Sequence, residues 1–433
     1  MKQWRNYSIN CRRMIMTSRE RIKASFAHKQ PDKVAVDFGG FSCSMINATC
    51  VKELREHYGL PYQPPRINDM STMTAYVDED LADAMGSDVW QLFNYADTYG
   101  HINTAWKEWT YRGDTVLIPS NCTINDDGVG GYYVYPEGDD SVAPGGHMPA
   151  GGFYFDNVER SPEFDEDEAN ADEQLEDFPL VDDKQIAYHK EIFEKYRGSN
   201  RAIQVAPGGS YLGDANNIPG PNVKNPRGIR SIQEWYMAPL LYPDYVHEVF
   251  EKEVEIAIAN FKKYYEAFGN DIDVAYICGA DFGTQRGPFM DPKIFCEFYK
   301  PYYKKMNDWI HQNTQWKTLK HSCGGIFPIL PHLIEAGFDA INPVQCSAEG
   351  MEPQVLKDTF GKDIVFWGGG VDTQSVLPFG KPQEVKDQVK KRIEIFNKDG
   401  GFVFNTIHNI QANTPIDNIV AMVDAIKEYN GDK

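Results

Sequence analysis

The second half of the chain repeats one pattern: a short apolar run, a polar or glycine-containing turn, and an amphipathic segment. Short apolar runs rich in β-branched and aromatic residues predict buried strands. The predicted strands are VAVDFGG (34–40), RAIQVAP (201–207), DVAYICG (273–279), TLKHSC (318–323), DAINPVQ (339–345), DIVFWGG (363–369) and FVFNTIH (402–408).

The longer segments between these runs place apolar residues three or four positions apart, which predicts helices packed against the strands. They cover 232–242, 245–268, 293–312, 326–337, a stretch near Val355, 381–397 and 416–429. Strands that are apolar on both faces and alternate with helices indicate a parallel sheet covered by helices. The number of units predicts an α/β fold of the (β/α)8 TIM barrel type. A doubly wound sheet is less suitable, since no G-x-G-x-x-G follows an early strand.

We expect one barrel domain over residues 17–433, preceded by an N-terminal extension over 1–16 and interrupted by an insertion at about 120–190. Thr17 or Ser18 can cap the first helix. Within the insertion, 126–155 is rich in Gly, Tyr and Pro and suits a hairpin or lid. Residues 156–183 carry thirteen acidic residues against one Arg, a pattern typical of a solvated or partly disordered loop; a docking face for a basic partner is the alternative.

The formal charge of the chain is −20, and its pI is about 4.9. Proteins that bind nucleic acid or anionic membranes need a basic face, so both partners are excluded. No run of 18 apolar residues is present, which argues against a membrane span. The eight cysteines are scattered rather than arranged as a disulfide framework, which favours a reduced, cytoplasmic compartment.

Polar residues follow the predicted strands, where a barrel of this type carries its active site. The polar strand ends are Asp37–Gly40, Cys278–Gln285, His321–Gly325, Asn342–Cys346, Trp367–Asp372 and Asn405–Gln411. Because six strand ends carry carboxylates, imidazoles, amides or thiols, we expect one shared pocket at this rim.

His321 and Cys323 lie two apart on a predicted strand, so their side chains face the same side. An imidazole and a thiolate together provide half of a zinc site, and catalytic zinc commonly has three protein ligands. Candidates for the third ligand are His408, Cys346, Asp281 and Glu349.

Other polar residues of the rim suit catalysis or substrate binding. Asp281 could be a ligand, a general base or a partner that orients His321. Candidate substrate contacts are the amides of Gln285, Asn342, Gln345 and Gln411, and Trp367, which would lie beside a flat substrate.

The motifs GADFGTQRGPFMDPKIF (279–295), HSCGG (321–325), INPVQCSAEGM (341–351), VFWGGGVDTQ (365–374) and HNIQANTPIDNI (408–419) resemble the uroporphyrinogen decarboxylase superfamily. The resemblance implies a barrel from about Thr17 to Tyr429 and one of two chemistries. The tetrapyrrole decarboxylases hold the substrate carboxylates with arginines of an early motif. The corresponding segment here, DFGGFSCSM (37–45), has no arginine, which argues against that substrate.

The second branch, the cobalamin-dependent methyltransferases, carries a His-x-Cys pair and a later Cys that together hold zinc. His321 and Cys323 match this pattern, while the third position falls on His408. A site with two His and one Cys favours binding of oxygen, so the chain resembles methyltransferase components of O-demethylases.

The resemblance implies that a methyl group passes from a methoxylated small molecule to the cobalt of a corrinoid protein, with Asp281 or Asp37 as proton source. We also expect that the chain can form a homodimer. A metal-free decarboxylase or other lyase on the same barrel is the alternative function, and a non-enzymatic binding protein is a further one.

Overall fold

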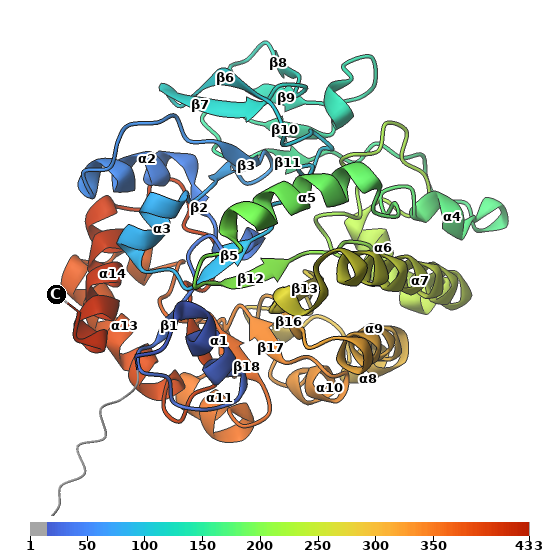
Figure 1. Ribbon diagram of the computed structural model, residues 1–433. Coiled ribbons are helices and arrows are strands. Elements are labelled where there is room, and N and C mark those ends of the chain that lie inside the picture. Colours follow the sequence, from blue (N-terminus) through green and yellow to red (C-terminus); the bar gives the residue numbers. More distant parts are fainter. Residues whose placement is uncertain (1–14, 433) are drawn as a thin grey trace, which may run out of the picture.

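The computed structural model describes residues 15–432, so most of the predicted N-terminal extension lies outside the described residues. Parallel strands gather at the centre and helices surround them (Figure 1). The eight-stranded sheet has the order β1-β19-β18-β17-β16-β13-β12-β5. Its strands are β1 (Ala35–Val36), β5 (Val89–Gln91), β12 (Ala202–Val205), β13 (Val274–Cys278), β16 (Lys317–His321), β17 (Ala340–Asn342), β18 (Val365–Trp367) and β19 (Phe402–Phe404).

The sheet closes into the predicted (β/α)8 barrel where β1 meets β5. The backbone N–H of Asp88 donates to the carbonyl of Val36 at 2.7 Å, and the Val36 N–H donates to the Asp88 carboxylate at 2.9 Å. Seven of the eight strands coincide with predicted strands, and β5 was not predicted.

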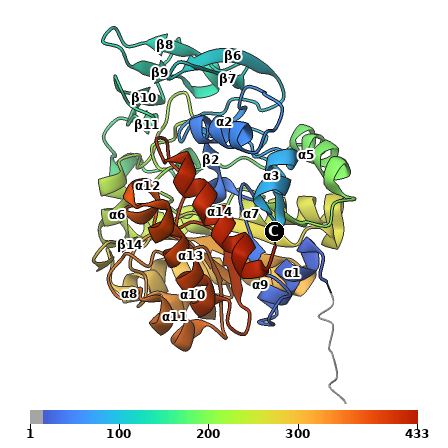
Figure 2. The same ribbon diagram turned by 90° about the vertical axis from the view of Figure 1, so that its left-hand side faces the viewer.

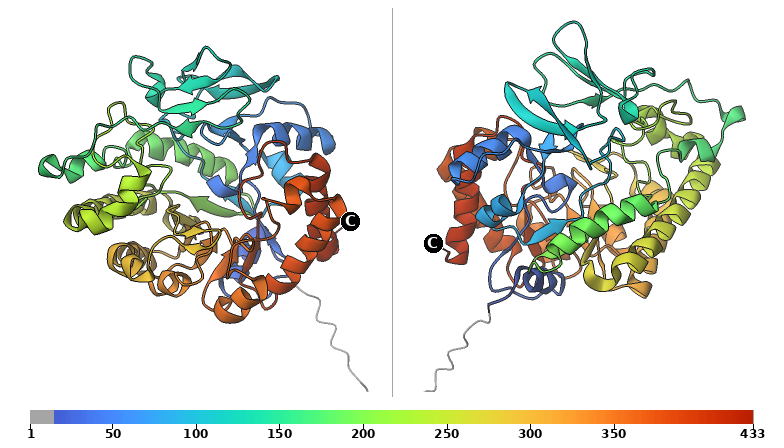
Figure 3. Two further views of the ribbon diagram at one scale, coloured as in Figure 1. Left: turned by 180° about the vertical axis from the view of Figure 1, so that it is seen from behind. Right: turned by 45° about the horizontal axis from the view of Figure 1, so that its top comes forward.

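The helices cover the outside of the barrel in both further orientations (Figures 2 and 3). The helices are α1 (Ser18–Phe26), α2 (Ala48–His57), α3 (Glu79–Met85), α4 (Ala171–Gln174), α5 (Asp183–Tyr196), α6 (Ile232–Leu241), α7 (Pro243–Phe268), α8 (Pro292–Ile294), α9 (Lys300–Asn313), α10 (Leu330–Glu335), α11 (Pro353–Phe360), α12 (Val376–Phe379), α13 (Pro382–Phe396) and α14 (Ile416–Asn430). Among the described residues, no helix combines the length and the apolar character needed to cross a membrane.

Helix α1 begins with the predicted cap and closes one end of the barrel. Thr17 accepts a hydrogen bond from the Glu20 N–H, and the Glu20 side chain accepts one from Thr17 in return, which forms a capping box. Ile22 and Phe26 of this helix pack with the inward-facing residues of the strands, and the Phe26 ring lies 6.1 Å from the Trp367 ring.

Residues 106–157, which begin ahead of the insertion predicted at about 120–190, form small antiparallel sheets beside the barrel, seen at the top of Figures 1 and 2. They comprise β6 (Trp106–Tyr111), β7 (Asp114–Pro119), β8 (Ile124–Asp126), β9 (Tyr132–Val134), β10 (Gly146–Met148) and β11 (Asp156–Asn157). The Tyr154 hydroxyl accepts from the Ala412 N–H at 3.2 Å, which fastens this unit to the loop after β19. The remaining short strands are β2 (Ile46–Asn47), β3 (Ile67–Asp69), β4 (Thr74–Ala75), β14 (Gly283–Thr284) and β15 (Gly287–Pro288).

Part of the acidic segment 156–183 is fixed by buried contacts. The segment is therefore not a solvated loop over its whole length. Asp177 and Arg230 form an ion pair at 3.0 Å, and their side chains are 1% and 0% exposed. Phe164 packs against Tyr242 and Tyr245. The expectation of a solvated loop is therefore wrong for the inner part of this segment, because buried partners compensate its buried charge and apolar residues.

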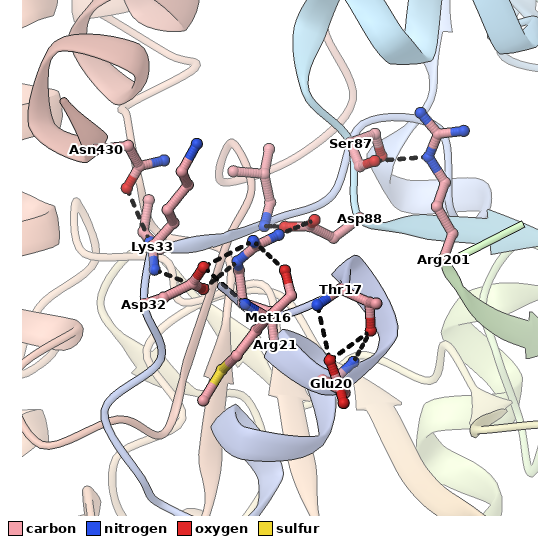
Figure 4. A network of polar contacts seen from close by, with 12 residues as sticks. Met16, Thr17, Glu20, Arg21, Asp32, Lys33, Ser87, Asp88, Arg201 and Asn430 are labelled. Atoms are coloured by element: carbon pink, nitrogen blue, oxygen red, sulfur yellow. Dashed lines mark hydrogen bonds and ion pairs between the residues drawn. The ribbon is translucent and has the colours of Figure 1, made fainter. Parts of the chain in front are cut away.

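An ion network beside the closure of the barrel links α1 to β5 (Figure 4). The Arg21 guanidinium donates to Asp32 at 2.9 Å and to Asp88 at 2.5 Å. Burial raises the pKa of Asp88 and Arg21 opposes this shift. Arg21 therefore compensates the charge of the carboxylate that joins β1 to β5.

We predict that Arg21→Ala lowers the free energy of unfolding by about 3–5 kcal/mol, because the substitution leaves a buried carboxylate without its cation. Denaturant unfolding followed by circular dichroism measures this change. Lys23→Ala on the same helix is the matched control, since Lys23 is 61% exposed and exposed ion pairs contribute less than about 1 kcal/mol. Equal effects of the two substitutions would contradict the prediction.

Candidate metal centre at the mouth of the barrel

Each barrel strand contributes one small or apolar residue to a common inner cluster. These residues are Ala35, Val89, Ala202, Val274, Leu319, Ala340, Val365 and Val403. Side chains alternate along a strand, so the residue two positions further also faces inward. That next position carries a polar atom on every strand: Asp37, Gln91, Gln204, Tyr276, His321, Asn342, Trp367 and Asn405. The barrel interior is therefore apolar toward α1 and polar toward its mouth.

Part of this polar layer is bonded to itself. His321 Nδ1 and Asn342 Oδ1 are 2.6 Å apart, and Asn342 Nδ2 donates to the Trp367 carbonyl at 2.8 Å. The Trp367 indole N–H donates to Asp37 Oδ2 at 2.9 Å, and Asn405 Nδ2 donates to the Asp37 carbonyl at 2.7 Å. This chain of bonds runs through β16, β17, β18, β19 and β1 and fixes the His321 ring.

The other part of the layer has unused acceptors. Gln91 and Gln204 are register partners on β5 and β12, and each is at least 96% buried. Among the described residues, neither amide oxygen has a hydrogen-bond partner, and the same holds for Asn405 Oδ1. An unpaired buried carbonyl oxygen is costly, so these atoms suit a donor group of a ligand or a bound water.

Three side chains predicted for the metal site, those of His321, Cys323 and Asp281, lie close together. His321 Nε2 lies 3.3 Å from Cys323 Sγ and 3.9 Å from Asp281 Oδ1, and the ligand atoms of all three residues lie within 4.8 Å of one another. Asp281 also accepts a hydrogen bond from the Cys323 N–H at 2.6 Å. Asp281 thus both faces the imidazole and positions the thiol.

His408 joins a second group that shares His321. The ligand atoms of Cys43, His321 and His408 lie within 4.8 Å of one another, and the two imidazole rings are 5.3 Å apart. Of the three predicted ligands, His321 therefore belongs to both groups, Cys323 to the first and His408 to the second. Sequence reasoning missed Cys43, although it lies in the segment 37–45 that was inspected for arginines.

Close backbone packing positions Cys323. Gly324 has φ +89°, and a Cβ at this position would lie 2.2 Å from the carbonyl carbon of Gly283. Because a side chain is excluded there, the loop after β13 and the loop after β16 touch through their backbones.

Burial controls the protonation of these groups. It lowers the pKa of His321 and of His408 to about 4, so both imidazoles are neutral and able to bind a metal. Burial and the nearby Asp281 raise the pKa of Cys43 to about 12 and that of Cys323 well above its ordinary value. The thiols are therefore protonated without a metal, and metal binding would release their protons.

Several other predicted site residues are buried or form hydrogen bonds within the protein. Asn342 is fully buried and orients His321, and Gln345 Oε1 accepts from the Gly324 N–H at 2.7 Å. The prediction that Trp367 lies beside a flat substrate is wrong, because its ring is 0% exposed inside the barrel. Asp37 is also 0% exposed, and its two carboxylate oxygens accept from the Gly40 N–H and from Trp367.

The other two candidate ligands, Cys346 and Glu349, belong to neither group of possible ligands. Cys346 Sγ donates to the Val344 carbonyl at 3.3 Å and belongs to neither group. Glu349 also belongs to neither group, and its N–H donates to the Gln285 carbonyl at 2.9 Å. The Gln285 side chain is exposed, and Gln411 is half-buried.

A second carboxylate near Asp281 was not predicted. A Cβ on Gly279 would lie 2.6 Å from Asp214 Oδ2 and 2.7 Å from the Tyr276 hydroxyl, so both groups flank the end of β13. Burial and the charge of Asp281 raise the pKa of Asp214 to about 6. The glycine-rich stretch after the predicted strand 201–207 ends at Asp214 and was the available signal.

The two groups that share His321 together contain two neutral imidazoles and two thiols, which are side chains that zinc prefers. The bond from His321 Nδ1 to Asn342 leaves Nε2 free to coordinate, an arrangement common around metal-binding histidines. The residues present therefore fit a zinc ion.

Comparisons with known proteins agree with this fold. Residues 226–429 match the family described as uroporphyrinogen decarboxylase (URO-D), which confirms the predicted resemblance over this range. A curated relative named uroporphyrinogen decarboxylase, from Christiangramia forsetii, is 25% identical over 187 residues, which are 43% of this chain and 49% of the relative. The aligned part of the chain thus spans about half the length of that relative.

A solved structure of a methyltransferase from Methanosarcina mazei covers nearly the whole chain. It is 17% identical with a TM-score of 0.56, and the match covers 96% of this chain and 99% of that chain. The barrel and its insertion therefore follow a fold that is already known in a methyltransferase.

Proposed function

We propose that the protein is a zinc-dependent methyltransferase that moves a methyl group from a methoxylated, aromatic compound to the cobalt of a corrinoid carried by a partner protein. The observation that carries the proposal is the pair of ligand groups that share His321 at the barrel mouth. The family match and the fold shared with a methyltransferase support it.

Zinc held by His321, Cys323 and His408 would supply a Lewis acid for the ether oxygen of the methyl donor. In the transfer, the bond between oxygen and methyl breaks with its electron pair left on oxygen. The methyl group joins the reduced cobalt, whose electron pair forms the new bond. The departing oxygen takes up a proton.

Asp281 is the better placed of the two predicted proton sources. Its side chain is 38% exposed and lies 3.9 Å from His321 Nε2, whereas Asp37 is fully buried and bonded to Trp367. A general acid must reach the oxygen that it protonates. We therefore assign the proton to an Asp281 oxygen and give Asp37 the role of fixing the polar layer.

The buried cations of the described chain are engaged by protein groups, which favours a donor without several carboxylates. Lys320, beside His321, donates to the Ala280 and His321 carbonyls. The fully or nearly buried arginines of the described chain pair with protein carboxylates: Arg21, Arg55, Arg201 and Arg230. The unpaired amide oxygens of Gln91 and Gln204 would accept hydrogen bonds from a hydroxyl group. A methoxylated phenol meets both conditions.

The first test is metal content. We expect about one zinc ion per chain, and a loss of most of it in His321→Ala and Cys323→Ala, because each substitution removes a ligand of a three-ligand site. Elemental analysis of purified protein measures the content. Variants that keep the zinc of the parent protein would refute the role of these residues.

The second test is the donor. Incubation with a reduced corrinoid protein and a panel of donors should give methylated cobalt, seen in the absorption spectrum, with methoxylated phenols and not with methylamines. Transfer from methylamines alone would show that the donor class is wrong. Absence of both metal and transfer would favour a decarboxylase or another lyase.

The third test concerns Asn342. Asn342→Leu should weaken zinc binding by about 10–100-fold, because His321 loses the bond that orients its ring. Asn342→Asp keeps an acceptor at the same place and should bind zinc more tightly than the Leu variant. Competition with a chromophoric chelator measures both affinities, and equal values would contradict the orienting role.

A further inference from the structure

The loop after β1 is built to hold one thiol in a fixed place. Its backbone folds into a short 3-10 helix over Ser42–Ser44, closed by a bond from the Gly39 N–H to the Ser44 carbonyl at 3.0 Å. The Phe41 ring packs on Tyr276 and Trp367 inside the barrel, at 5.6 Å and 6.2 Å between ring centres. Cys43 therefore sits on a loop that is anchored into the barrel core.

The same loop is tied to the segment that carries His408. Asn409 Nδ2 donates to the Ser42 carbonyl at 2.6 Å. The neighbour of Cys43 is thus bonded to the neighbour of His408, which sets the distance between the two side chains. This contact explains why a loop after β1 and a loop after β19 bring their side chains to the same point.

We propose that Cys43 is a zinc ligand, together with His321 and His408. The inference rests on the zinc site of the proposed function and adds a residue to it. The ligand atoms of the three residues lie within 4.8 Å of one another, as expected for atoms that share one metal ion, and Cys43 is half-buried rather than sealed in the core.

With Cys43, the two groups that share His321 contain two imidazoles and two thiols, which come from the end of β16 and from the loops after β1, β16 and β19. Two thiolates would neutralise the charge of Zn²⁺, and the ether oxygen of the methyl donor would add as a fifth ligand, an expansion that catalytic zinc allows. The metal would also join the first and last strands of the barrel to β16. Cys43 is therefore both a ligand and the link between zinc and the β1 loop.

Zinc affinity and cobalt spectra test the assignment without any methyl transfer. Cys43→Ser should lower zinc affinity at least 10-fold. In the Co²⁺-substituted protein, it should remove about half of the thiolate-to-metal absorption, since one of two thiolates is lost. Cys346→Ser is the matched control, because Cys346 is a half-buried thiol of the same rim outside both ligand groups.

A Cys43→Ser protein with unchanged zinc affinity and unchanged Co²⁺ absorption would overturn the assignment while leaving the proposed function intact. A parent protein that binds no zinc would overturn both. If Cys346→Ser lost its metal and Cys43→Ser kept it, the zinc ligand would be Cys346 and not Cys43.

A measurement on the parent protein tests the assignment even if the Cys43→Ser variant does not fold. Zinc should slow the alkylation of Cys43, followed by mass spectrometry of its peptide, and leave the rate at Cys346 unchanged. Equal protection of both thiols, or protection of neither, would count against Cys43 as a ligand.

Discussion

The closed parallel barrel imposes one constraint on which the rest of the molecule depends: side chains alternate between its inside and its outside. Eight inward positions are small or apolar and fill the barrel, and the eight positions two residues further on carry polar atoms. The polar layer is thus a direct consequence of strand geometry. Some of its groups are bonded to one another, and others keep unpaired amide oxygens.

This arrangement explains how a neutral His321 is kept in one orientation. Burial removes the proton that would block coordination, and the bonds through Asn342, Trp367 and Asp37 fix the ring. The hydrogen-bonded part of the layer is consequently a scaffold for the candidate metal site. The amide oxygens of Gln91 and Gln204 have no partner among the described residues, so they lie in the part that remains for a ligand.

The sequence predicted the barrel and most of its strands because apolar runs and helices alternate regularly. It did not reveal β5, since the next element after this strand is β6 and not a helix. It also placed Trp367 at the rim, because the last residue of a strand can face either into the packed interior or into the mouth. Cys43 escaped notice because it lies on a loop, where residue spacing does not fix direction. The buried pair of Asp177 and Arg230 joins residues far apart in the chain, so no local pattern indicated it.

Helix α1 closes the opposite end of the barrel with Ile22 and Phe26. With this end closed, a small substrate and a large protein partner would both approach the candidate site from the mouth of the barrel. For the proposed methyl transfer this imposes an order: the small molecule enters first, the partner then covers it, and the demethylated product leaves only after the partner has withdrawn. A helix far from the candidate site would thereby set the order of events in the proposed reaction.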